Sequence, residues 1–221
     1  MKNFSRRSSA GFLLVLPLLC FGFPLAASAG DARITFRKVF EGSTPEFVEI
    51  RVGQTSGATC DIRQLSEDPD PRPFEIGPAV RAKIFELAGE LHNFNGAHLD
   101  VRKRIANLGQ KTLRYERDAE VYETTFNYTI DPAASQLLEI FEGLTRQEWD
   151  LTLLERRMRF DRLGVNDALM EFEADLNERI LPEPERLLPT LDQLANDPRF
   201  LDIARQRARA LAERIRASMK Q

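Results

Sequence analysis

The stretch that decides the fold is RITFRKVFEGSTPEFVEIRVGQTSGATCDIR, residues 33–63. Apolar side chains recur in it at every second position, which places them on one face of a β-strand. Glycine, serine, threonine and proline separate the alternating runs at residues 42–45 and 53–57, as turns require. The stretch therefore predicts three strands in an antiparallel meander, with these inward residues: Ile34, Phe36, Val48, Ile50, Val52, Ala58, Cys60 and Ile62.

Two later segments return to the same period and extend the sheet. Residues 112–116 and 122–130 alternate apolar and polar side chains, and the polar residues 117–120 form the turn between them. They predict a hairpin that completes a sheet of about five strands. Residues 66–73, SEDPDPRP, hold three prolines and three acids, so we expect a loop there.

A helix is expected between the two groups of strands. Pro78 opens a pattern in which the apolar residues of 80–94 share one helical face, and Asn95-Gly96 supplies a stop. This helix should pack across the sheet. Residues 99–108 fit either a strand with a turn or a short helix, and helical or irregular structure is favoured.

The chain reads as helical after Ile130. Asp131 can cap a helix that begins at Pro132, and residues 145–148, TRQE, fit a capping box for a second one. Gly164 can end that second helix, and Asn166 can cap the next. Four prolines between residues 182 and 198 then separate short helices. We expect an all-helical C-terminal region over residues 131–221.

The last helix has the clearest apolar stripe and the clearest charge asymmetry. Residues 167–197 carry nine acids against two arginines, whereas residues 199–221 carry seven bases against two acids. Packing of the helices with flanking ion pairs is favoured over a basic amphipathic helix that docks on anionic lipid or an acidic partner. Residues 187–195 and 198–215 resemble one helical hairpin of HEAT-type repeats. The stripe consists of Ala204, Ala208, Leu211, Ala212 and Ile215.

The first 29 residues have the three parts of a secretory signal peptide. Lys2, Arg6 and Arg7 precede a charge-free apolar run, which ends in Ala27-Ser28-Ala29. We expect cleavage after Ala29 and a periplasmic or secreted protein; an uncleaved anchor is not favoured, because prolines interrupt the run. The predicted organisation is a signal peptide over 1–29, an α+β sheet domain over 30–130 and a helical region over 131–221, which either stands apart or packs on the sheet as one unit.

The composition of the predicted mature chain limits which classes of partner it can bind. Residues 1–29 hold three of the 31 basic residues and no acid, which leaves 28 basic against 34 acidic side chains. This mildly acidic balance argues against nucleic acid as a partner. The one remaining cysteine, Cys60, excludes an internal disulfide, and its place in an alternating strand favours a small buried hydrophobe over a reactive thiol.

No motif for catalysis, cofactor binding or metal binding is recognisable, so we assign no catalytic, cofactor or metal residue. The least implausible candidates for a hydrolase assembled only in the fold are Glu90, His92, His98 and Asp100. The two histidines lie six positions apart, whereas a zinc-binding pair on one helix would be three or four positions apart. The acids of residues 67–70 lack the regular spacing of a calcium loop, so a solvated loop is favoured.

The sequence therefore predicts an α+β fold: an antiparallel sheet of about five strands with a covering helix, followed by an all-helical C-terminal region. The layout resembles small exported cystatin-like modules, a likeness of architecture that implies no function. The favoured function is an exported, non-catalytic module that binds or supports an unknown protein or envelope component. The alternatives are a secreted hydrolase and peripheral lipid binding through the basic C-terminal helix, and membrane contact is not favoured.

Overall fold

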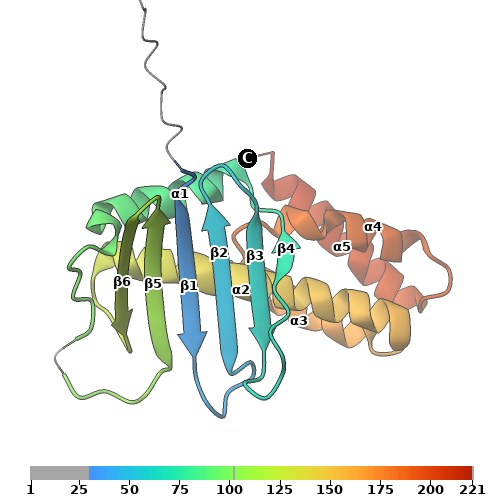
Figure 1. Cartoon of the computed structure of the whole chain (residues 1–221). Helices are drawn as coiled ribbons and strands as arrows, with labels where there is room; N and C mark the ends of the chain where they lie inside the picture. Colours follow the sequence, from blue (N-terminus) through green and yellow to red (C-terminus); the bar gives the residue numbers. More distant parts are fainter. Residues whose placement is uncertain (1–29, 102, 221) are drawn as a thin grey trace, which may run out of the picture.

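A computed structural model describes residues 30–101 and 103–220 of the 221-residue chain. Within these ranges the chain forms an antiparallel sheet in the order β4-β3-β2-β1-β5-β6, together with five α-helices (Figure 1). The predicted α+β class, with its covered antiparallel sheet and its helical C-terminal region, is confirmed. The predicted signal peptide lies outside the described residues.

The three strands of the decisive stretch are neighbours in the sheet and lie between β4 and β5. They are β1 (Arg33–Val39), β2 (Phe47–Gly53) and β3 (Ala58–Arg63), and each pairs antiparallel with the next. Phe36 stands opposite Ile50, and Ile50 stands opposite Cys60, so the predicted inward residues fall into register. The meander is confirmed by this antiparallel pairing, and the two-residue period places the inward residues of the three strands on one face.

One strand lies where a loop was expected. The strand β4 (Arg72–Phe74) pairs with β3 at the edge of the sheet and places Pro73 opposite Thr59. The prediction of a loop over residues 66–73 is therefore wrong at its C-terminal end. Proline has no amide hydrogen to donate and is therefore excluded from central strands. An edge strand tolerates Pro73 because only one side of that strand forms hydrogen bonds with a neighbouring strand.

The predicted hairpin is confirmed as β5 (Gln110–Arg117) and β6 (Glu120–Phe126). The second strand ends at Phe126, four residues earlier than predicted, and Tyr128 and Ile130 are exposed. It ends there because the amides of residues 127 and 128 donate to the Asp100 carboxylate, both over 3.2 Å, and leave the ladder. Residues 97–101 and 103–109 form neither helix nor strand, as the irregular alternative predicted.

Two helices cover the inner face of the sheet. The helix α1 (Pro78–Glu90) is followed by the short turn η1 (His92–Phe94), and the chain reverses at Gly96, whose φ is +65°. The helix α2 (Pro132–Phe160) crosses behind the sheet (Figure 1), and its Phe141 ring stacks on Phe36 with centroids 5.1 Å apart. The covering layer is therefore α1 together with the first half of α2.

The start of α2 follows the prediction, but its middle does not. The Asp131 carboxylate accepts from the Ala134 amide over 2.9 Å, as a helix N-cap should. The capping box at residues 145–148 does not form, because Thr145 donates to the Phe141 carbonyl within one continuous helix of 29 residues. The helix also continues through Gly143. A Cβ at this position would stand 2.4 Å from the Ile180 carbonyl oxygen, so glycine permits the close approach of the two segments.

The remaining helices build a second core. They are α3 (Val165–Glu178), the short η2 (Pro184–Leu187), α4 (Leu188–Asn196) and α5 (Asp202–Ser218). Gly164, and not Asn166, occupies the N-cap position of α3, so that predicted cap is wrong. The predicted α5 stripe is buried in full. Because α2 contributes Phe141 to the sheet core and Leu154 to the helical core, it joins the two regions; their division at residue 130 stays a prediction.

Candidate functional site

The first part of the candidate site is a hollow of about 520 Å³ between α2 and the hairpin of β1 and β2. The hollow lies beside α2 on the inner face of the sheet, and its walls are mainly apolar. Lys38 of β1 and Glu142 of α2 form an ion pair of 3.0 Å at its edge. It thus offers apolar contact with charge at its border. The apolar walls are Phe36, Phe40, Pro45, Val48 and Trp149.

A second hollow, of about 320 Å³, continues along the same helix. It lies between α2, β3 and the loop that leads to β4, and three arginines line it: Arg63, Arg72 and Arg156. Pro45 and Trp149 line both hollows, so the two hollows adjoin at these residues. We call this pair of hollows the Trp149 groove. Both parts expose mainly apolar surface, and charged side chains are more numerous around the second part.

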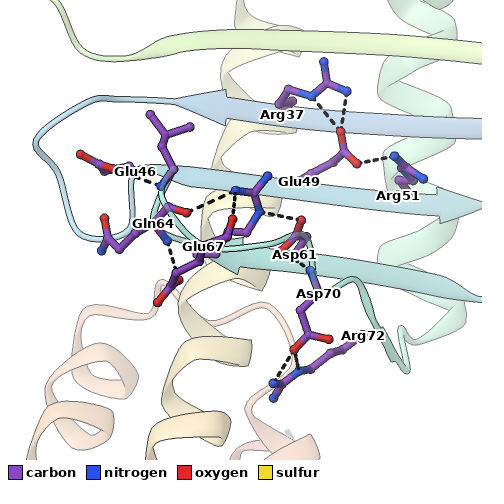
Figure 2. A network of polar contacts seen from close by, with 11 residues as sticks. Arg37, Glu46, Glu49, Arg51, Asp61, Gln64, Glu67, Asp70 and Arg72 are labelled. Carbon is purple, nitrogen blue, oxygen red and sulfur yellow. Dashed lines mark hydrogen bonds and ion pairs between the residues drawn. The ribbon is translucent and has the colours of Figure 1, made fainter.

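Hydrogen bonds fix the loop that borders the second hollow (Figure 2). The Arg63 guanidinium donates to the Asp61 carboxylate over 3.1 Å and to the carbonyls of Gln64 and Glu67 over 3.2 and 2.9 Å. The Glu46 carboxylate accepts from backbone amides of residues 42 and 65, and these bonds lower its pKa. Both loops beside the groove are therefore held by charged hydrogen bonds.

The acidic run over residues 67–70 takes part in this loop. The Glu67 carboxylate accepts from the Gln64 amide over 2.8 Å, and Asp70 pairs with Arg72 over 2.6 Å. All four residues of the run are exposed. Within residues 30–101 and 103–220, no three His, Cys, Asp or Glu side chains gather as a metal ion would need.

No helix of the described residues covers the outer face of the sheet (Figure 1). Glu49 contacts Arg37 of the neighbouring strand over 2.6 Å and Arg51 of its own strand over 2.5 Å (Figure 2). Arg114 pairs with Glu116 of its own strand over 2.8 Å and with Glu123 of the next strand over 3.5 Å. These pairs join charges within and across strands, as expected of a solvated sheet face.

A seam of buried polar groups lies on the side of α2 that faces the helical core. Glu148 pairs with Arg186, and the Glu183 amide donates to the Gln147 side chain over 3.0 Å. The Glu183 carboxylate in turn accepts from the Gly77 amide over 2.7 Å. Burial raises the pKa of Glu148 and of Glu183. The seam ties the start of α1 to the segment before α4.

Next along the seam, two buried carboxyl groups share one arginine. Arg146, which also lines the groove, pairs with Asp175 of α3 and lies 3.5 Å from Asp150 of α2. Burial, followed by the nearby Asp175 charge, raises the pKa of Asp150 to about 7. One guanidinium balances one carboxylate, so the second carboxyl favours its protonated form. This triad fixes a wall residue of the groove to the helical core.

Cys60 is buried, as its place in the alternating strand predicted. Cys60 lines the second hollow, and burial raises the pKa of the thiol to about 12. A thiol in this state carries almost no thiolate at neutral pH, and the thiolate is the nucleophile.

The structure does not gather the four candidate hydrolase residues. Glu90, His92, His98 and Asp100 are all exposed, and Asp100 uses its carboxylate to hold the end of β6. The five principal hollows in the described part of the chain are lined by other residues. These four residues therefore line none of these hollows, and the hydrolase alternative stays a prediction.

The charged blocks of the C-terminal region meet as helix packing predicts. Arg207 and Arg214 of α5 both pair with Glu173 of α3, and Arg216 pairs with Asp192 of α4 over 2.5 Å. These three α5 arginines thus contact acids of their own chain, whereas Arg209 donates to the Ala195 carbonyl over 3.3 Å. No helix in the described ranges combines the length and apolar character that crossing a bilayer requires.

Sequence reasoning missed the Trp149 groove. Its walls come from strands β1 to β4, two loops and α2, and no local pattern indicates that these segments border one groove. One signal was present: Trp149 is the only tryptophan of the chain, and it stands in a helix among polar neighbours. A large aromatic side chain in that setting is typical of contact surfaces.

No family model, no curated protein and no solved structure matches this chain. The likenesses to HEAT-type hairpins and to cystatin-like modules therefore stay predictions. The functional argument depends on the geometry of the chain itself.

Proposed function

We propose that this chain is an exported, non-catalytic protein of the cell envelope that binds a segment of another protein in the Trp149 groove. The observation that carries the proposal is the meeting of two hollows at Pro45 and Trp149, where mainly apolar walls lie beside the charged side chains of the second hollow. Apolar anchors beside charged groups are typical of sites that bind polypeptides.

The length of the groove favours a polymer over a small metabolite. Its walls on α2 extend from Glu142 to Arg156, fourteen positions along the helix. At about 1.5 Å per residue this is about 21 Å. An extended peptide rises about 3.3 Å per residue, so about six residues would fill the groove. We expect an apolar side chain of the partner beside Trp149 and polar groups beside Arg63 and Arg156.

Site-specific photo-cross-linking in living cells tests this proposal. A photoreactive amino acid replaces Thr145, which lines the first hollow, or Thr152, which lines the second. Thr125, exposed on the outer face of the sheet, is the matched control. We expect one and the same cross-linked protein from both groove positions and none from Thr125. Equal cross-linking at all three positions, or none at the two groove positions, would contradict the proposal.

Truncation of the central side chain tests the anchor. Substituting the half-buried Trp149 by alanine should weaken binding of the cross-linked partner about 30-fold, the usual effect of losing a tryptophan hot spot. Ile130→Ala, which removes an exposed apolar side chain elsewhere, should leave the affinity unchanged. Equal losses in the two variants would place the partner outside the groove.

The proposed location rests on the N-terminal leader and has its own test. N-terminal sequencing of the native protein should begin at Gly30, and the protein should fractionate with the periplasm or the medium. A native protein that begins at Met1 and remains in the cytosol would remove the envelope from the proposal and leave the groove untouched.

A further inference from the structure

Four large apolar side chains are exposed at one end of the helical region. Phe160 and Leu163 stand at the corner between α2 and α3 and are 76% and 75% exposed. Leu201 and Ile203, at the start of α5, are 47% and 56% exposed. Such a group on a water-soluble surface is unusual, because each side chain gains free energy when it leaves water.

The two corners lie at the same end of the molecule. The α2–α3 and α4–α5 connections both appear at the right-hand end of Figure 1. A hollow of about 420 Å³ spans them, lined by Arg159 and Arg162 from one corner and Arg199 from the other. We call this end the helix-tip patch: Phe160, Leu163, Leu201 and Ile203, with Arg156, Arg159, Arg162 and Arg199.

The patch is basic, although the predicted mature chain is acidic. Arg156, Arg159 and Arg162 are exposed, and no carboxylate of the described residues lies within 4.0 Å of them. Asp161 pairs with Arg157 and Asp197 pairs with Arg199 over 2.6 Å, whereas the exposed acids Glu155 and Asp167 have no ion-pair partner among the described residues. The α5 arginines described above face acids of their own chain. Three unpaired arginines thus outnumber two unpaired acids, so the unpaired charge around the exposed apolar side chains is positive.

We propose that the helix-tip patch docks this protein on an anionic lipid bilayer. Phe160 and Leu163 would enter the boundary between headgroups and acyl chains, while the arginines contact lipid phosphates. A second copy of the chain is a poorer occupant, because two such patches would bring arginines face to face. This surface shares only Arg156 with the Trp149 groove, and it would leave the apolar walls of the groove open to a partner.

Vesicle sedimentation with the mature chain tests the proposal. The probes are vesicles of phosphatidylcholine alone and vesicles with about 30% phosphatidylglycerol, each at low and high salt. We expect binding to the anionic vesicles that weakens with salt, and little binding to phosphatidylcholine. The double substitution Arg159→Gln with Arg162→Gln should weaken binding about 25-fold, about fivefold for each arginine. Phe160→Ser with Leu163→Ser should weaken it about tenfold.

Matched controls separate the patch from general charge and hydrophobicity. Arg33→Gln with Arg117→Gln removes the same charge from exposed positions on the sheet, and Ile130→Ser removes an apolar side chain that is 75% exposed. Both controls should bind as the parent does. Absence of binding to anionic vesicles, equal losses in patch and control variants, or salt-independent binding would each overturn the proposal. Self-association that the patch substitutions abolish, without vesicle binding, would assign the surface to a second copy instead.

Discussion

The buried carboxyl pair of α2 and α3 makes the stability of this protein depend on pH in a specific way. The substitution Asp150→Asn keeps the shape and a hydrogen-bond donor toward Asp175 but removes the titratable group. Asp150 is 3% exposed, and neither of its carboxylate oxygens has a hydrogen-bond partner among the described residues. A protonated carboxyl can donate to Asp175, whereas an ionised one cannot, so the folded state favours the proton.

The magnitude follows from the change in pKa between the unfolded and folded states. The ordinary pKa is 3.8, and burial together with Asp175 raises it to about 7 in the folded protein. The folded state therefore holds a proton that the unfolded state releases, and stability is lost as the pH rises from about 4 to about 7. At about 1.4 kcal/mol per pKa unit the loss is at most about 4 kcal/mol. Relaxation and water penetration reduce the cost of a buried charge, so we expect about half of this.

Thermal and urea unfolding, followed by circular dichroism between pH 4 and pH 8, measures the effect. Asp150→Asn should match the parent at pH 4 and exceed it by about 2 kcal/mol at pH 8, or by about 4–8 °C in Tm. Glu139→Gln, which removes an exposed charge from the same helix, should show no such pH-dependent gain. A variant that is less stable than the parent at pH 8, or a difference that is the same at both pH values, would refute the reasoning.

Three further substitutions or reagents probe the fold. Phe141→Ala, which removes the ring stacked on Phe36, should destabilise the protein by about 3–5 kcal/mol in urea unfolding; a loss below about 1 kcal/mol would contradict the packing. Asp131→Ala should cost about 1 kcal/mol and Asp131→Asn much less, because only alanine removes the oxygen that caps α2; equal losses would contradict the cap. In the mature chain at pH 8, Cys60 should react with a thiol reagent about a thousandfold more slowly when folded than when unfolded, since its pKa is about 12 against 9.0; equal rates would show an accessible thiolate.

Local patterns sufficed for the sheet. The alternation at Ile34, Ile50 and Cys60 predicted three antiparallel strands, because only one face of each strand could be buried. The same pattern overran at Tyr128, whose amide donates a hydrogen bond to the distant Asp100 carboxylate where the strand ends. Pro73 misled in the opposite direction, because whether a strand lies at an edge is a property of the whole sheet.

Helix boundaries depended on contacts that are distant in the sequence. Thr145 has the local signature of a cap, but helix α2 continues through it because buried residues on both sides pack into two different cores. Gly143 marks a close crossing with the chain near Ile180, and nothing in its own neighbours announces that crossing. The α5 stripe was predictable because all of its contacts fall on one helical face.

The candidate groove was not predictable for the same reason. Lys38, Arg63 and Trp149 come from three elements, and they line one groove only after α2 crosses the sheet. The histidines invited a search for chemistry because of their residue type, but the structure leaves both exposed beside no principal hollow of the described residues. Geometry, and not residue type, indicates where this chain would bind.

The emission of Trp149 tests the central claim most directly, because it is the only tryptophan of the chain and lines both parts of the groove. The measurement is a fluorescence titration of the mature protein with the purified partner recovered by cross-linking, or with a tryptophan-free peptide from it. The account predicts a saturable change in emission and protection from acrylamide quenching, with the same affinity that calorimetry gives. Binding measured by calorimetry without any change at Trp149 would show that the partner binds elsewhere.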